Sequence, residues 1–206
     1  MATNDSSTGG YLGPTTPAPL EDLTLDVVIA GLIAGVTGLD PIRVLPRDQP
    51  NQPHIPDIGV TWVSVGVMTS TPDDTPAQIH HPDGDGYSIL RSFYRLDVLA
   101  SFYGPKGDLY AKLTRDALYV AQNREAMRVY GLNLVGFDPI RRLPDIVATQ
   151  TRRRSDLAFQ LTQVIERRYE IRNVQSLDGT IKAQGGSSAG PKLLTSPLST
   201  TPPAGA

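Results

Sequence analysis

The stretch of the chain closest in composition to a metal site runs from His80 to Gly86 and reads His-His-Pro-Asp-Gly-Asp-Gly. Imidazole nitrogens and carboxylate oxygens are common metal ligands. A calcium loop, however, needs further oxygens and a distal bidentate glutamate, whereas Tyr87-Ser88-Ile89 begins a strand. We therefore interpret the stretch as a hairpin tip of turn-forming residues, which can still be an interaction site. Its candidate contact residues are His80, His81, Asp83 and Asp85.

The remaining residues do not form a recognisable catalytic constellation. All three histidines fall in expected loops, and the chain has no cysteine to serve as a thiol nucleophile or thiolate ligand. The sequence contains neither the Gly-x-x-x-x-Gly-Lys loop that binds phosphates nor the Gly-x-Gly-x-x-Gly turn that binds dinucleotides. We therefore expect no enzyme activity, no cofactor and no metal.

Several arginines lie in clusters that could contact a subunit or another partner. These residues are Arg141, Arg142, Arg152, Arg153, Arg154, Arg167 and Arg168. A nucleic-acid site favours a basic face with interleaved aromatic residues. Here the net charge is −2, and few aromatic residues lie near the clusters. We rank a solvated strand end first, a subunit interface second and DNA contact third.

The charge of the chain is unevenly distributed along its length. Residues 1–86 hold two arginines and eleven acidic residues, whereas residues 87–206 hold seventeen basic and ten acidic residues. Either the two halves neutralise each other within one domain, or they form complementary surfaces that meet between subunits. Arginines outnumber lysines fifteen to four, which favours the second interpretation because arginine is enriched at protein interfaces.

The two ends of the chain differ in composition from its middle. Residues 1–20 and 183–206 are rich in Ser, Thr, Gly and Pro, so they cannot bury enough apolar surface to offset their ordering entropy. We expect flexible arms at 1–20 and 183–206 around a single domain at 21–182. The longest apolar run, near Val27–Ile33, is too short and too interrupted by glycine to span a bilayer, and no secretory signal is visible.

The clearest structural pattern lies between Tyr87 and Ala121. Apolar residues at alternate positions predict a strand with one buried face; they are Leu90, Tyr94, Leu96, Val98, Ala100 and Phe102. Gly104-Pro105-Lys106-Gly107 then predicts a sharp turn. Asp108 is expected to cap an amphipathic helix. The apolar face predicted for this helix consists of Leu109, Leu113, Ala117, Val120 and Ala121.

Further elements are expected on both sides of this unit. A helix is predicted over Glu21–Ala34 and ends at Gly35 and Gly38, with Leu25, Ile29 and Ile33 on one face. Strands are predicted at Ile42–Leu45, Ile58–Thr69, Leu132–Phe137, Ser155–Ile165 and finally through Asp178-Gly179, with a polar loop at Ser70–Gly86. The order α-β-β-β-α-β-β-β predicts an α+β fold, in which two helices flank a mainly antiparallel sheet.

One nine-residue motif occurs twice. Gly38–Pro46 reads GLDPIRVLP and Gly136–Pro144 reads GFDPIRRLP, with seven of nine positions identical. The match does not extend into the flanking residues. A duplicated half-domain and a repeated solution to the same turn both explain the motif, and we assign it no chemistry.

Several local motifs occur in a recognisable order. A helix leads to Gly-x-x-Gly-Leu and a short strand, a later strand ends in Phe-Tyr-Gly before Asp-Leu-x-x-x-Leu, and Gly-Leu-x-Leu-Val precedes a long strand led by arginines. The motifs lie within Ile33–Leu45, Leu96–Leu113, Gly131–Asp138 and Arg152–Ile171. In this order the chain resembles the bacteriophage neck or tail-terminator (tail-completion) family over most of residues 21–182.

The resemblance implies a structural protein of the virion with a tail-terminator-like α+β fold. Members of the family form a ring, typically of about six copies, that ends polymerisation of the tail tube and joins the tail to the head connector. The implied partners are further copies of the chain, the tail-tube protein, a head-completion or connector protein and, as a further candidate, the sheath protein. Genomic DNA is expected to pass through the ring lumen without specific binding, and no membrane is involved.

Two other hypotheses remain open at this point. The protein could be another neck component, such as a head-completion, connector-side or collar protein. A hypothesis of a different class is a metal- or nucleic-acid-binding module that uses the histidine stretch or the arginine clusters. A tail terminator and another neck component share the same expected location, which is the neck of the virion at the top of the tail. Both would be assembled in the cytoplasm of the bacterial host.

Overall fold

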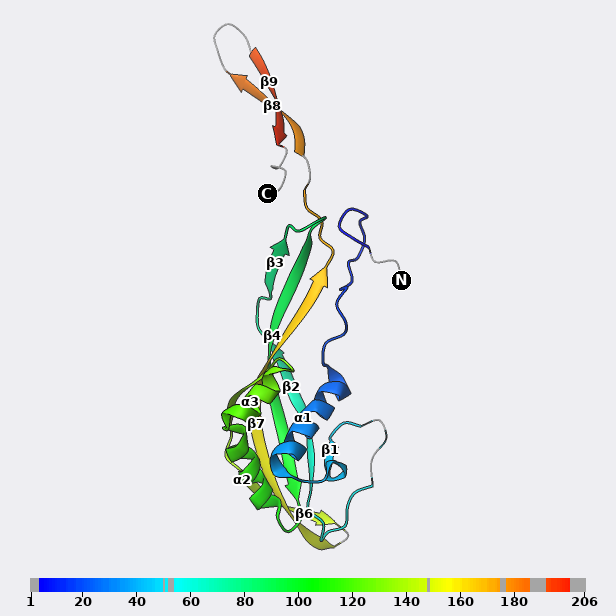
Figure 1. Cartoon of the computed structure of the whole chain (residues 1–206), viewed down its shortest axis with the longest axis vertical. Coiled ribbons are helices and arrows are strands. Elements are labelled where there is room, and N and C mark those ends of the chain that lie inside the picture. The colour runs from blue at the N-terminus through cyan, green and yellow to red at the C-terminus, as the bar shows by residue number, and fades with distance from the viewer. Residues whose placement is uncertain are drawn as a thin grey trace. The chain divides into compact units, whose positions relative to one another are not determined.

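The computed structural model describes residues 4–49, 51, 54–147, 149–174, 177–185 and 192–200. It confirms the predicted α+β fold, with helices packed on a sheet (Figure 1). The helical segments are α1 (Asp22–Thr37), the 3-10 turn η1 (Pro41–Arg43), α2 (Gly107–Leu118) and α3 (Ala121–Arg128). The strands are β1 (Val44–Pro46), β2 (Trp62–Pro72), β3 (Ala77–His81), β4 (Tyr87–Tyr103), β5 (Leu132–Phe137), β6 (Arg141–Val147), β7 (Gln150–Tyr169), β8 (Leu177–Gly185) and β9 (Lys192–Thr200).

Contacts between Cα atoms divide the chain into two compact units. Unit 1 comprises Met1–Thr15, His80–Ile89 and Arg168–Ala206, and unit 2 comprises Thr16–Ile79 and Leu90–Arg167. The hydrophobic core of the described residues lies within unit 2, between its helices and its strands. The expectation of one domain over residues 21–182 stays a prediction, and part of the expected C-terminal arm lies outside the described residues.

The main sheet has seven strands and is mainly antiparallel, as predicted. Its order is β1-β2-β4-β7-β5, with β3 paired to β4 and β6 paired to β7. Strand β1 runs parallel to β2, whereas the pairs β2–β4, β5–β7 and β6–β7 are antiparallel. The strand predicted through Asp178-Gly179 is present as β8, and it forms a separate antiparallel pair with β9.

Helix α1 crosses the sheet of unit 2 and contacts α2, β1 and β2 (Figure 1). It begins with a capping box between Glu21 and Thr24. It ends at Gly38, whose left-handed backbone (φ 69°) lets its N–H donate to the carbonyl of Ala34. The helix ends at Thr37 and not at the predicted Ala34, because Gly35 continues it instead of ending it. The predicted face is confirmed, since Leu25, Ile29 and Ile33 are buried.

The strand–turn–helix segment is confirmed in outline, but two details of the prediction are wrong. Asp108 lies in the first turn of α2, after the N-cap residue Lys106, so it does not cap the helix. The buried face of α2 is also not the predicted one. Along β4, the alternate residues Leu96, Val98, Ala100 and Phe102 are buried as expected. Along α2, the buried residues are instead Gly107, Ala111, Thr114 and Leu118. Leu109 and Leu113 are 58% and 41% exposed, so their predicted burial is wrong.

The turn at the start of α2 explains why this face is buried. A Cβ atom added at Gly107 would lie 2.7 Å from the carbonyl oxygen of Phe102, so the first turn of α2 packs directly on the end of β4. Positions four, seven and eleven residues further along the helix then face the sheet as well. Two of them, Ala111 and Thr114, are small enough to allow the close approach. The helix also ends at Leu118, so the predicted continuation through Val120 and Ala121 is wrong.

Strands β1 and β2 both begin later than predicted. Asp40 caps η1 by accepting a hydrogen bond from the N–H of Ile42, so Ile42 lies in a 3-10 turn and the strand begins at Val44. Residues 58–60 form a turn before β2, and the loop predicted over residues 70–86 contains the end of β2 and the short strand β3. The predicted alternation from Ser155 to Ile165 is confirmed, because every second residue of this part of β7 is buried.

The two copies of the nine-residue motif adopt different conformations. Asp40–Arg43 forms the capped 3-10 turn, whereas Asp138–Ile140 is irregular and Arg141 begins β6. A repeated solution to the same turn is therefore wrong as an explanation of the motif.

Candidate functional site

The two histidines of the predicted hairpin tip contact other residues of unit 1. His80 at the end of β3 places Nδ1 3.0 Å from the hydroxyl of Ser88 and Nε2 2.8 Å from Oδ1 of Asn173. The ring of His81 stacks on the ring of Tyr87, with centroids 4.8 Å apart. Both imidazoles therefore help to hold the hairpin together.

The two aspartates of the tip are also engaged within unit 1. The carbonyl of Asp83 accepts a hydrogen bond from the N–H of Gly86, which closes the turn, and the carboxylate of Asp85 accepts one from Arg172 at 2.9 Å. The hairpin tip thus binds the segment after β7 by backbone and side chain. In the part of the chain that the structure describes, no group of three or more histidine or acidic residues is arranged to hold a metal ion.

Arg172 also binds the N-terminal residues to the other segments of unit 1. Its guanidinium donates Nε and Nη2 to one carboxylate oxygen of Asp5, at 3.1 and 3.0 Å. Hydrogen bonds from Ser7 and then from Arg172 lower the pKa of Asp5 to about 2. The N–H of Thr15 donates to the carbonyl of Arg168, and the N–H of Ser6 donates to that of Glu170, so residues 5–15 lie along the end of β7 and the residues that follow it.

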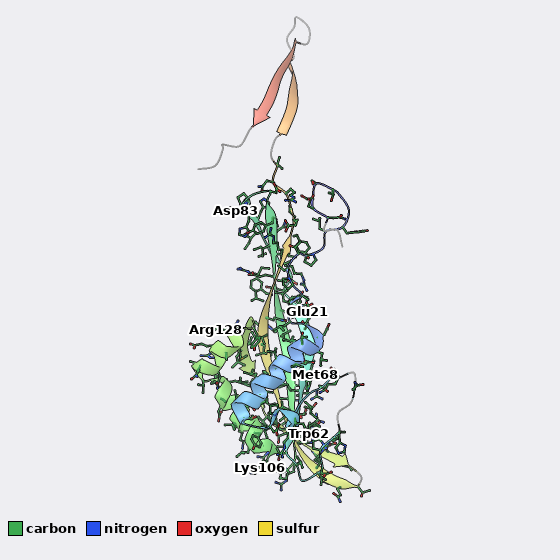
Figure 2. The ribbon with its side chains drawn as sticks, turned by 45° about the vertical axis from the view of Figure 1, so that its right-hand side comes forward. Glu21, Trp62, Met68, Asp83, Lys106 and Arg128 are labelled. Carbon is green, nitrogen blue, oxygen red and sulfur yellow. The ribbon has the colours of Figure 1, made fainter. Side chains whose placement is uncertain are left out.

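Arg152 is the most buried arginine of the predicted clusters. Its side chain is 8% exposed and donates Nε and Nη2 to Asp145, its partner on the neighbouring strand β6. The guanidinium also lies 4.5 Å from the ring centroid of Tyr103, which stacks on Trp62 (Figure 2 labels Trp62). Arg152 therefore joins β2, β4, β6 and β7 within the chain and has little surface to offer a partner.

The other arginines of the clusters divide into paired and unpaired residues. Arg142 pairs with Asp108, Arg154 with Asp156, Arg167 with Glu21 and Arg168 with Glu170. Arg141 and Arg153 are exposed, and within the described ranges neither forms an ion pair. The clusters predicted from the sequence are thus brought together only in part, because Arg141, Arg142 and Arg152–Arg154 lie on the paired strands β6 and β7, whereas Arg168 belongs to unit 1.

A groove with a basic rim lies between α2 and the β6–β7 pair, and we call it the basic groove. Its volume is about 660 Å³. Besides the paired arginines it is lined by Lys106 and Arg153, and by the apolar side chains of Leu109 and Leu143. Lys106 is exposed at the N-terminal end of α2 and, among the described residues, has no acidic partner. The groove therefore combines two free cations with exposed apolar surface.

A second groove lies between α1 and β2, and we call it the acidic groove. Its volume is about 480 Å³, and its lining includes Glu21, Asp22, Asp26, Asp48 and Met68. Burial raises the pKa of Asp26, and the negative charge of Asp48 adds to the effect, although a hydrogen bond from the N–H of Val67 opposes it. Asp26 is thus a carboxylate held in an unfavourable environment.

The sequence reasoning missed this acidic groove and the exposed face of α2. Asp22 and Asp26 are four residues apart on one helix, which is a detectable signal for one acidic face. Asp48 comes from the loop after β1, and only the parallel pairing of β1 with β2 brings it to the same groove. No sequence signal indicates this pairing. Among the described residues, no helix is both long and apolar enough to cross a membrane.

The fold and its surfaces define a sheet-based unit that offers charged and apolar grooves but, within its described part, no metal cluster. A comparison with family models finds that residues 21–186 match the family described as phage neck terminator protein. The chain belongs to this family, and it is a structural protein of the phage neck. No curated protein matches the chain.

Proposed function

We propose that the protein is a tail terminator that assembles into a closed ring of about six copies on the end of the tail tube. The ring ends polymerisation of the tube and presents its other face to the head-completion or connector protein. It is assembled in the cytoplasm of the bacterial host and stays in the virion at the top of the tail. Its lumen lets the genomic DNA pass without specific binding.

The observation that carries this proposal is the exposed apolar face of α2. Leu109 and Leu113 point away from the buried stripe of the same helix, and Val120 and Val129, just beyond α2 and α3, are also exposed. Exposed apolar residues that lie one helical turn apart are costly for a protein that works alone. They are favourable where another subunit covers them, which supports an assembled form of this family member.

The sheet provides a second line of support. Strands β1 and β5 end the order of the main sheet, so each has one edge without a described partner strand. Such edges pair readily with another chain unless they are protected. Arg141 and Arg153 remain as exposed candidate contact residues near β6, and the hairpin tip with His80 and His81 remains a candidate contact of unit 1.

Electron microscopy of tails tests the proposal directly. Particles lacking this protein should contain tails of irregular length that do not carry heads, and the purified protein should form rings that decorate tail ends. Tails of normal length that merely fail to join heads would instead favour another neck component. A purified protein that stays monomeric at all concentrations and never binds tail ends would contradict the proposal.

A further inference from the structure

We infer that, within the ring, the rim of the basic groove of one copy binds in the acidic groove of the next copy. The inference rests on the proposed ring and names the two surfaces that meet in it. The contact joins two different surfaces, because the acidic groove lies between α1 and β2 and the basic groove between α2 and β6–β7. Such a head-to-tail contact forms a closed ring when the rotations between successive copies add up to a full turn.

Among the described residues, cations of the same copy balance the carboxylates of the acidic groove only in part. Asp22 and Asp48 form no ion pair within the described ranges, and Glu21 is already paired with Arg167. Arg47 lies near Asp26 and attracts it, but the guanidinium donates to the hydroxyl of Ser101 and makes no ion pair with Asp26 among the described residues.

A cation that enters the acidic groove therefore gains the attraction of several carboxylates at once. Asp26 is 93% removed from solvent, since its exposed fraction is 7%, so its interaction with a cation is only weakly screened. A cation would also lower the pKa of Asp26 again by favouring its charged form. The groove thus fits a basic partner better than an apolar or acidic one.

The basic groove supplies cations of the required kind. Lys106 and Arg153 are exposed on its rim without acidic partners in the described part of the chain. Both have long side chains, so they can extend across a contact into a neighbouring groove.

Apolar side chains flank the charges on both surfaces. Met68 and Leu23 line the acidic groove and are 54% and 38% exposed. Leu109 and Leu143 line the basic groove and are also exposed. Apolar contacts around an ion pair exclude water and strengthen the attraction between its charges.

One copy cannot bring these two surfaces together by itself. In Figure 2, Glu21 and Met68 mark the level of the acidic groove, and Lys106 lies nearer the opposite end of unit 2. All of these residues belong to unit 2. The complementary charges are therefore satisfied only when a second copy binds.

Charge reversal on each surface tests the inference. The first variant, D22K/D48K, makes both surfaces of a copy basic, and the second, K106E/R153E, makes both acidic. Each variant alone should remain monomeric, with a dissociation constant raised at least about 30-fold, because every contact then places like charges together. Matched controls with the same charge changes outside the two grooves are D57K/D74K and R124E/R128E, and both should form rings.

Mixing the two variants provides the decisive measurement. A copy of K106E/R153E, which is acidic on both surfaces, can bind a copy of D22K/D48K, which is basic on both, at each of its two contacts. An equimolar mixture should therefore form rings in which the two variants alternate. Light scattering after size exclusion gives the mass, and electron microscopy gives the shape. Circular dichroism verifies that each variant is folded. Should a reversal prevent folding, the neutral variants D48N and K106Q still test the loss of assembly in each variant alone, with smaller increases in the dissociation constant.

The outcomes separate this inference from the proposed function. A wild-type protein that never forms rings, alone or on tail ends, overturns both. Wild-type rings that persist in both reversed variants overturn the inference and leave the ring intact. Folded monomeric variants that fail to assemble on mixing also overturn the pairing, since a charged partner such as the tube protein would then have to occupy one of the grooves.

Discussion

Arg142 on β6 donates two hydrogen bonds to Asp108 in the first turn of α2, from Nε at 3.1 Å and from Nη2 at 2.5 Å. The bidentate geometry orients both groups and links the helix to the strand pair beside the basic groove. Lys112, one turn along α2, forms a second ion pair with the same carboxylate. Asp108 is therefore a connector between elements, in addition to its favourable place at the positive end of the helix dipole.

The first prediction concerns the titration of Asp108. Hydrogen bonds from Arg142 and then Lys112 lower its pKa to about 2. In R142Q the pKa should rise towards the usual value of about 4, but remain below it because Lys112 still binds. Carbon-13 NMR of the carboxyl group measures the shift. Asp5, whose pKa is lowered by Ser7 and Arg172, provides an internal control and should not change.

The same pKa sets the pH range in which this link contributes to stability. Because the folded pKa lies below the unfolded value, the contribution is fully present above about pH 4 and is lost as the pH falls towards 2. The side chain of Arg142 is largely exposed, so the effect on total stability is small. An R142Q variant that leaves the pKa of Asp108 at about 2 would contradict the role of this contact.

The second prediction concerns the buried guanidinium of Arg152. Its removal in R152A takes away the ion-pair partner of Asp145 and the nearer of the two guanidinium groups that lie over Tyr103. We therefore expect a loss of about 2–4 kcal/mol in the free energy of unfolding. R152K should recover only part of this loss, because lysine cannot form the bidentate contact. Urea denaturation measures both variants. The neighbouring R153A, which removes an exposed side chain, should cost less than about 0.5 kcal/mol at protein concentrations where the chain is monomeric.

The third prediction concerns Gly104, which turns the chain from β4 towards α2. Its φ is +94°, and a Cβ atom there would lie 2.4 Å from the carbonyl oxygen of Val60. G104A should therefore lower the free energy of unfolding by about 3 kcal/mol or more, through strain and a backbone clash. Gly59 has neither a positive φ nor a neighbour within 4 Å, so G59A should change stability by less than about 1 kcal/mol. Thermal and urea unfolding measure the stability of both variants. Equal losses in the free energy of unfolding for G104A and G59A would contradict the role given to Gly104.

The sequence was sufficient for those parts of the fold in which alternation or capping acts locally. The buried faces of β4, β7 and α1 follow from residue spacing alone, and the turn at residues 104–107 follows from its glycines and proline. The pairing of Arg152 with Asp145 could not be predicted, because it depends on the register of β6 against β7. The acidic groove likewise depends on the parallel addition of β1 to the sheet.

The prediction of the buried face of α2 was wrong for a different reason. The prediction assigned the largest apolar residues to the core, whereas the close approach of the helix to β4 selects small residues on the buried side. The apolar residues left outside are those for which we propose a partner. A pattern of hydrophobic residues thus identifies an amphipathic helix, but it cannot distinguish a face that packs in the core from a face that binds another subunit.

The fourth prediction distinguishes these two faces of α2 by experiment. Leu118 is fully buried, and L118A should lower the free energy of unfolding by about 3 kcal/mol through lost contacts and a cavity. Leu113 is 41% exposed, so L113A should cost less than about 1 kcal/mol in the monomer. The order should reverse for assembly: folded L113A should form rings less readily than the wild type, because its exposed face then offers less apolar surface. Urea denaturation at low protein concentration measures the first effect, and light scattering at high concentration measures the second. If L113A destabilised the monomer as much as L118A, the exposed leucines would belong to the core, and the subunit contact proposed for this face would lose its basis.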